Sequence, residues 1–95
     1  MAETFANGVV DEADEGRFVL RENGHQALAD YRVQEGRMIV PHVEADHALR
    51  GTGAAGRLMA GVMEAARQRG LKVVPLCPYA DAYMRRHPET QDLRA

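Results

Sequence analysis

The fold of this 95-residue chain is decided by one stretch of sequence, Arg50-Gly51-Thr52-Gly53-Ala54-Ala55-Gly56. Before this stretch, apolar and polar residues alternate, and a period of two indicates strands. After it, apolar residues recur every three or four positions, which is the period of a helix. The stretch therefore predicts a glycine-rich turn that leads from a sheet into the longest helix of the chain.

The sequence after the glycines predicts an amphipathic helix between Gly53 and Gly70, the latter being the residue type expected just past a helix end. Its apolar stripe consists of Ala55, Leu58, Met59, Val62, Met63 and Ala66. Residues 71–76 form a short apolar run typical of a buried strand. Pro78 suits the first turn of a second, shorter helix, and His87-Pro88 marks its end.

The sequence before the glycines predicts an antiparallel meander. Residues 17–21 alternate and then meet Asn23-Gly24, the favoured pair for a two-residue type I′ hairpin. Two further strands are expected at residues 27–33 and 37–44, with a reversal at Gln34-Glu35-Gly36 between them.

The last strand before the glycines carries a proline. Pro41 cannot donate a ladder hydrogen bond, so the strand is expected to be an edge there or to contain a bulge near His42. Alternation places Met38, Val40, His42 and Glu44 on one face of this strand. An additional short strand is predicted at Val9-Val10.

Composition narrows the classes of function. The length fits one domain, and the formal charge of −2 gives no overall positive field for nucleic acid or an anionic membrane. A single cysteine, Cys77, cannot form an internal disulfide, and residues 1–14 lack the order of a signal peptide, so we expect a cytoplasmic location. No metal is expected, because zinc-ligand spacing is absent among His25, His42, His47 and His87.

The glycine turn has the composition of an anion site. Glycines let the backbone approach a ligand, and the amides that open a helix attract negative charge, to which Arg50 adds a full positive charge. The pattern Gly51-x-Gly53-x-x-Gly56 also satisfies the dinucleotide fingerprint. That interpretation lacks an acidic residue at the end of the next strand and enough chain for a second mononucleotide-binding half. A P-loop is excluded because no Gly-Lys-Ser/Thr follows.

Written as Arg50-x-x-Gly53-x-Ala55, the turn resembles the pyrophosphate-binding motif of the GNAT superfamily of acetyl-CoA-dependent N-acetyltransferases. The resemblance runs from Met38 to about Leu93 and is most specific to the small single-domain GNAT-like proteins. It is carried by Glu44 with Ala48-Leu49-Arg50-Gly51-x-Gly53, by Gly70-Leu71-Lys72-Val73-Val74-Pro75-x-Cys77-Pro78-Tyr79, and by Tyr83-x-Arg85-Arg86-His87-Pro88-Glu89. It implies an α+β fold in which the meander continues into a mixed sheet that opens beside the bulged strand.

The resemblance also implies a set of site residues. Acetyl-CoA would be bound by Val43, Arg50, Gly51, Thr52, Gly53, Ala54, Ala55, Gly56, Arg85 and Arg86. A backbone amide near Val43 would polarise the acetyl carbonyl. For Arg85 and Arg86, capping of the last helical turn is the alternative to contact with CoA phosphates. A plain strand-to-helix turn is the alternative for the glycines.

Three side chains are candidates for the chemistry of acetyl transfer. Glu44 would relay the proton of the amine, with His42 next in line and a solvated strand-end carboxylate as the alternative. Tyr83 would protonate the departing thiolate; a core tyrosine stacked with Tyr79 is its alternative. Cys77 precedes a helix and could carry the acetyl group covalently, although direct transfer and a small buried side chain are favoured over that route.

The sequence therefore predicts one GNAT-like acetyl-CoA-binding domain over residues 1–95, with residues 1–7 and 89–95 frayed. It would transfer the acetyl group directly to a primary amine, and an open cleft would suit a protein lysine or N-terminus. The alternatives are a CoA-binding or protein-interaction module with little or no turnover, and a purely structural domain. The acceptor and the oligomeric state are not encoded in any pattern we recognise.

Overall fold

The computed structural model describes residues 2–95. Its strands are β1 (Thr4–Phe5), β2 (Val9–Glu12), β3 (Arg17–Glu22), β4 (His25–Gln34), β5 (Arg37–Ala45) and β6 (Lys72–Pro75). Its α-helices are α1 (Ala54–Gln68) and α2 (Pro78–Arg86), and its 3-10 turns are η1 (Ala6–Gly8), η2 (Ala13–Glu15), η3 (His47–Leu49) and η4 (Pro88–Leu93).

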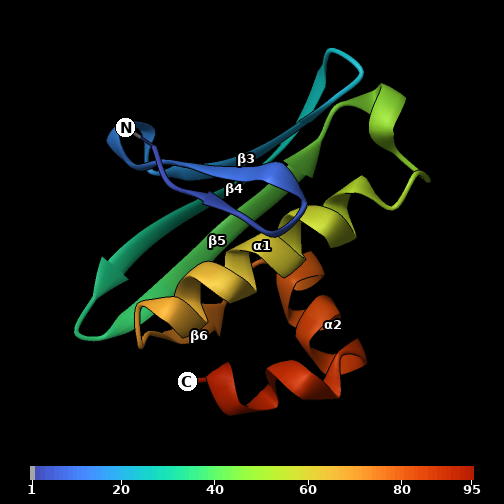
Figure 1. Ribbon diagram of the computed structural model, residues 1–95. Helices are drawn as coiled ribbons and strands as arrows, with labels where there is room; N and C mark the ends of the chain where they lie inside the picture. The colour runs from blue at the N-terminus through green and yellow to red at the C-terminus, as the bar shows by residue number, and fades with distance from the viewer. Residues whose placement is uncertain (1) are drawn as a thin grey trace.

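The six strands form one sheet in sequence order, and α1 crosses one face of it (Figure 1). Strands β1 to β5 are antiparallel neighbours, whereas β6 pairs parallel to β5 after the crossover through α1. The predicted α+β class, with a meander continued into a mixed sheet, is confirmed. Apolar side chains of the sheet and of α1 and α2 share one buried cluster between these layers.

Local sequence explains the tight turns of the meander. Asn23 and Gly24 have φ angles of 52° and 78°, as the predicted type I′ hairpin between β3 and β4 requires. Glu35 and Gly36 repeat this geometry between β4 and β5, with φ angles of 53° and 76°. The predicted strand at Val9-Val10 is also present, as β2.

Strand β5 contains the bulge that Pro41 predicted. Its pairing with β4 shifts between Asp30 and Arg32, where Val40 and Pro41 lie opposite a single residue of β4. An extra residue in one strand reverses the alternation of side chains beyond it. The bulge therefore changes which side chains of β5 face the helices.

The expectation that His42 and Glu44 share a face with Met38 and Val40 is wrong for this reason. Met38 and Val40 are fully buried in the core, but beyond the bulge it is Val43 that packs against the core. His42 and Glu44 are exposed on the sheet face opposite α1.

The described residues near both chain ends, where we expected fraying, make contacts with the rest of the fold. In the described part of residues 1–7, β1 pairs with β2, and Phe5 is only 6% exposed. At the other end, η4 buries Thr90 and Leu93, and Arg94 forms a bridge to Val73 of β6. Tertiary packing holds both ends against the core.

The sheet opens where β5 and β6 part. The two strands pair only from Arg37 to Val40, opposite Lys72 to Pro75. Beyond Val40, β5 continues to Ala45, whereas the chain that leaves β6 turns away into α2. The last link across the split is a hydrogen bond from the Cys77 amide to the Val40 carbonyl (3.0 Å). This is the opening that the resemblance implies, and it leaves one edge of residues 41–45 without a neighbouring strand.

Candidate functional site

The turn before α1 is shaped by its glycines. Gly51 and Gly53 have φ angles of 77° and 85°, in the left-handed region that other residues rarely adopt. Between them, the Thr52 hydroxyl donates to the Leu49 carbonyl and accepts a hydrogen bond from the Ala54 amide (3.2 Å). Thr52 therefore stabilises the start of α1 from within the turn.

Four backbone amides of this turn have no hydrogen-bond acceptor among residues 2–95, namely those of Gly51, Gly53, Ala55 and Gly56. Unpaired amides at a helix N-terminus carry partial positive charge and bind anions. Arg50 is exposed beside them, and no ion pair or side-chain hydrogen bond within the described chain engages its guanidinium. The turn thus offers donors that the fold itself does not use.

Two adjoining hollows extend from these donors. The first has a volume of about 270 Å³ and reaches from the turn to Ala45, at the end of β5, with Tyr79 of α2 on its wall. The second, of about 320 Å³, shares Gly53, Gly56 and Tyr79 with the first and runs between α1 and α2. Together they form a groove that crosses the first turn of α1 and leads toward the opened part of the sheet.

This combination of a bulged strand, an opened sheet and an unpartnered glycine turn agrees with the comparison to known families. A family model described as GCN5-related N-acetyl-transferase matches residues 17–93. The chain belongs to this family. The match extends from β3 to η4 and leaves β1, η1 and β2 outside it. No curated protein matches the chain.

In this member of the family, the two arginines of α2 that were predicted to bind phosphate lie differently. Arg86 lines the second hollow, close enough to Tyr79 to affect the pKa of its hydroxyl. Arg85 lines neither hollow and instead pairs with Asp81 one turn earlier, at 3.1 Å. The structure therefore separates two residues that the sequence grouped together.

The predicted proton donor, Tyr83, does not line the first hollow, which reaches Ala45 at the end of β5. Its ring stacks on His87, with ring centroids 3.8 Å apart, and lies in the second hollow with only 9% of the residue exposed. Burial is the main cause that raises the pKa of the Tyr83 hydroxyl, and the nearby Glu89 carboxylate raises this pKa further. Tyr83 is packed as a core residue on the side of α2 that faces α1.

Tyr79 lines the groove, although the sequence did not single it out as a candidate for the chemistry. It lines both hollows, and its hydroxyl lies 3.9 Å from the position that a Cβ on Gly56 would take. Burial raises the pKa of the Tyr79 hydroxyl, and the positive charge of Arg86 opposes this rise. The sequence held one signal for its position: Tyr79 lies in the first turn of α2, which follows β6 at the point where the sheet opens.

Glu44 and His42 form a pair on the open face of the sheet. His42 Nε2 and Glu44 Oε1 are 2.8 Å apart, and both side chains are more than half exposed. The structure thus brings Glu44 to the opened part of β5 but does not bring it together with Tyr83. Val43, between His42 and Glu44 in the sequence, turns its side chain toward the core.

Cys77 lies at the split between β5 and β6. It is 7% exposed and occupies the N-cap position of α2, where its side chain forms no capping hydrogen bond. Its amide is held by the Val40 carbonyl, so the residue is fixed at the point where the sheet opens.

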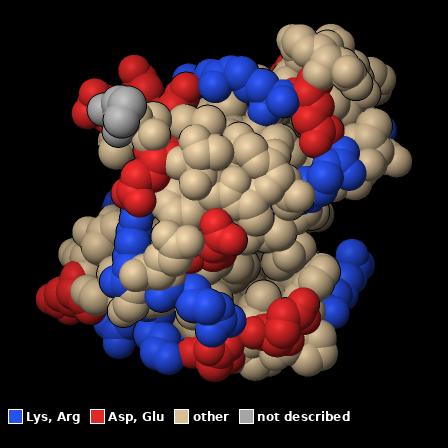
Figure 2. All heavy atoms as spheres, viewed as in Figure 1, with Lys and Arg blue, Asp and Glu red and all other residues tan. Residues whose placement is uncertain are grey.

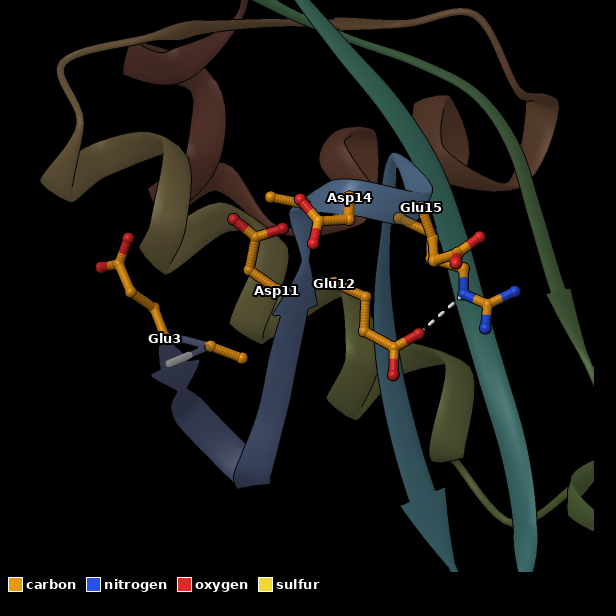
Figure 3. A pocket seen from close by; sticks show the side chains of 8 residues that line it. Glu3, Asp11, Glu12, Asp14 and Glu15 are labelled. Carbon is orange, nitrogen blue, oxygen red and sulfur yellow. Dashed lines mark hydrogen bonds and ion pairs between the residues drawn. The ribbon is translucent and has the colours of Figure 1, made fainter.

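A hollow larger than these two lies elsewhere on the described chain. It has a volume of about 620 Å³ and its lining includes Asp11, Glu12, Asp14 and Glu15, which come from β2 and the following turn, and Glu3, which lies just before β1 (Figure 3). Among residues 2–95, no group of three or more His, Cys, Asp or Glu side chains has an arrangement that could hold a metal ion. Such a hollow repels anions and is therefore a poor site for a diphosphate.

The rest of the visible surface is of mixed charge. Figure 2 shows Lys and Arg interleaved with Asp and Glu around a largely uncharged centre on the side of α1. Within the described chain, neither α-helix has the length and the apolar character that would be needed to cross a membrane. The unpartnered donors of the glycine turn remain the feature that distinguishes the site.

Proposed function

We propose that this protein is an acetyl-CoA-dependent N-acetyltransferase that moves the acetyl group of the CoA thioester directly to a primary amine. One observation carries the proposal: four residues whose amides have no acceptor among residues 2–95, together with Arg50, which has no ion pair there, line a groove that leads to the opened sheet. Family membership indicates acetyl transfer, and the groove supplies a place for the donor.

The turn fits the diphosphate of CoA chemically. Backbone amides and a guanidinium are the groups that bind phosphate oxygens best, and the amides of Gly51, Gly53, Ala55 and Gly56 are free to do so. Thr52 and Ala54 support these amides from within the turn. Arg86, on the second hollow, is placed to meet a further phosphate at the nucleotide end.

The unpaired edge of β5 fits the pantetheine arm. Residues 41–45 have no strand neighbour on the side of β6, and an extended amide-containing chain can pair with such an edge. A backbone amide near Val43, beside the bulge, would then donate to the carbonyl oxygen of the thioester. The first hollow joins this edge to the glycine turn.

Transfer requires a base, an acid and a neutral amine. We assign to Glu44 the role of the base that takes the proton of the amine. His42 is hydrogen-bonded to Glu44 and would share this proton. The amine nitrogen bonds to the carbonyl carbon, the carbon–sulfur bond breaks, and the sulfur takes a proton. Tyr79 replaces Tyr83 as the proposed donor of that last proton, because Tyr79 lines the cavity over the turn.

The acceptor is proposed from the surroundings of Glu44. Helices α1 and α2 lie on the other face of the sheet, so Glu44 and His42 are open to a large partner (Figure 1). A lysine side chain or an N-terminus of another protein can reach an open face of this kind. A small metabolite, by contrast, usually needs a pocket that encloses it.

The test is release of CoA from acetyl-CoA in the presence of lysine-containing peptides. Glu44→Gln and Tyr79→Phe are expected to lower kcat by about 100-fold, the usual contribution of one general acid or base. Tyr83→Phe is the matched control and is expected to keep most of the activity. Cys77→Ser is expected to remain active, because direct transfer does not need the thiol.

The outcomes separate the possible functions. Tight binding of acetyl-CoA with no release above buffer would favour a CoA-binding or protein-interaction module. Absence of acetyl-CoA binding would overturn the proposal altogether. Loss of activity in Cys77→Ser, with trapping of an acetylated thiol, would replace direct transfer by a covalent route.

A further inference from the structure

Arg57, one turn into α1, ties the glycine turn to a distant part of the sheet. Its Nε and one terminal nitrogen contact the two carboxylate oxygens of Glu22 at 2.8 and 2.7 Å. Its other terminal nitrogen donates to the carbonyl of Thr52 at 3.1 Å. Glu22 is the last residue of β3, so the side chain of Arg57 joins the β3–β4 hairpin to the centre of the turn.

The contact with the Thr52 carbonyl fixes a peptide plane. In a trans peptide, the C=O and the next N–H point in opposite directions. When Arg57 holds the Thr52 carbonyl, the amide of Gly53 is turned away from Arg57. This amide is one of the four that have no acceptor within residues 2–95. The orientation of the Thr52–Gly53 peptide thus determines whether an anion meets the Gly53 amide, a donor, or the Thr52 carbonyl, an acceptor.

Thr52 and Gly53 are held on either side of this peptide, but within residues 2–95 the Thr52 carbonyl itself is bonded only by Arg57. Gly53 has a φ angle of 85°, and glycine passes between positive and negative φ at little steric cost, so the peptide can rotate. A carbonyl turned toward a diphosphate would repel it. Arg57 is therefore the group that selects the binding orientation, and Glu22 is the group that holds Arg57.

We infer that the Glu22–Arg57 pair is a positioning lock, which keeps the Gly53 amide directed at the diphosphate of acetyl-CoA. The inference rests on the proposed function, since it concerns how the same turn binds its ligand. In this inference Arg57 acts through the backbone: each of its three guanidinium nitrogens donates one hydrogen bond to a protein oxygen, and one of these oxygens is the Thr52 carbonyl.

The positioning lock predicts that loss of the Glu22 charge weakens CoA binding, whereas charge repulsion alone predicts that it strengthens CoA binding. Removing the negative charge of Glu22 near an anion site would by itself strengthen anion binding. Removing the lock costs the Gly53 hydrogen bond to a charged group, an effect of about tenfold in affinity. Glu22→Gln is therefore expected to bind CoA about tenfold more weakly. Arg57→Lys keeps the charge but loses the two-pronged contact, and it is expected to weaken CoA binding by a similar factor.

The same helix offers a matched control. Arg67 contacts both carboxylate oxygens of Asp92 at 2.6 and 3.1 Å, and also the Glu89 carbonyl at 3.1 Å. This pair resembles the Glu22–Arg57 pair in geometry but lies near the other end of α1. Asp92→Asn is expected to shift the melting temperature by about as much as Glu22→Gln and to leave CoA affinity unchanged.

The experiment follows the Gly53 amide by NMR while 15N-labelled protein is titrated with CoA and, separately, with inorganic pyrophosphate. In the wild type and in Asp92→Asn, CoA and pyrophosphate are both expected to shift this resonance. In Glu22→Gln and Arg57→Lys, the midpoint of each titration is expected at a higher concentration of the added ligand. Unchanged or tighter binding by Glu22→Gln, or full affinity in Arg57→Lys, overturns the lock alone. Absence of any Gly53 shift in the wild type overturns the lock together with the diphosphate site.

Discussion

The glycine turn and the acidic hollow lie at opposite ends of α1 and use their polar groups in opposite ways. The acidic hollow is larger and more charged, but Asp11 is bound to Tyr31 and Arg69, and Glu12 is bound to Arg17 and Arg21. The glycine turn carries a single charged residue, and four of its amides have no acceptor within the described chain. Donors left unsatisfied by the fold, rather than volume or charge, therefore distinguish a ligand site from a structural network.

The largest effect is expected from the acidic hollow. Asp11 is 6% exposed, accepts a hydrogen bond from the Tyr31 hydroxyl at 2.7 Å and pairs with Arg69 at 2.7 Å. Asp11→Ala leaves the buried Tyr31 hydroxyl without an acceptor and leaves Arg69 with Glu3 as its remaining carboxylate partner; it is expected to lower the free energy of unfolding by about 3–5 kcal/mol. Urea denaturation measures the loss, and acetyl-CoA affinity of the folded variant should be unchanged.

Asp14→Ala is the control for that prediction. Asp14 lines the same hollow but is exposed and has no ion pair among residues 2–95. It is expected to change the free energy of unfolding by less than about 0.5 kcal/mol. A stability loss in Asp14→Ala equal to that in Asp11→Ala, or loss of acetyl-CoA binding in either, would contradict the contrast between the two regions.

The next prediction compares two glycines of α1, one beside the proposed ligand site and one packed against the sheet. A Cβ on Gly61 would lie 2.5 Å from Val9, whereas a Cβ on Gly56 would meet only the Tyr79 hydroxyl at 3.9 Å. Gly61→Ala is expected to destabilise the fold by about 2–3 kcal/mol through overpacking. Gly56→Ala is expected to raise stability by about 0.5–1 kcal/mol. Thermal unfolding of the two variants decides; equal stabilities would mean that Val9 does not rest on Gly61 of α1 as described.

Arg50→Glu is expected to affect binding alone. Arg50 is exposed and has no protein partner in the described chain, so stability should stay unchanged. Loss of one charged phosphate contact is expected to weaken acetyl-CoA binding by about 2 kcal/mol, or roughly 30-fold. Calorimetric titration measures the change. The exposed Arg85→Glu is the control; equal losses in both variants would indicate a general charge effect.

The smallest effect is a dependence of stability on pH. The hydrogen bonds from Arg57 lower the pKa of Glu22 below its ordinary value of 4.5. Because the folded-state pKa is depressed, this pair stabilises the fold fully above about pH 4.5 and loses its contribution as the pH falls through the lowered value. The melting temperature should drop on acidification below pH 4.5, and it should drop less in Glu22→Gln. An identical decline in both proteins would show that the pair does not stabilise the fold.

The sequence predicted the parts of the fold that depend on local chemistry. Asn23-Gly24 determines a hairpin, Gly53 and Gly70 bound the long helix, and Pro78 begins the second one. The glycine turn could likewise be recognised, because anion binding at a helix start needs only neighbouring residues.

The remaining features depend on contacts that a linear pattern does not contain. The exact place of the bulge reverses the faces of His42 and Glu44, and one residue of uncertainty is enough to exchange them. The choice between Tyr79 and Tyr83 depends on how α2 is rotated against α1. The link between Glu22 and Arg57 joins residues 35 positions apart, with no local signal.

The most direct test of the central claim is a crystal structure of the protein with CoA bound. The account predicts diphosphate oxygens within about 3.2 Å of the backbone nitrogens of Gly51, Gly53, Ala55 and Gly56, with the pantetheine arm along residues 41–45. A diphosphate bound elsewhere, with those nitrogens still unoccupied, would contradict it.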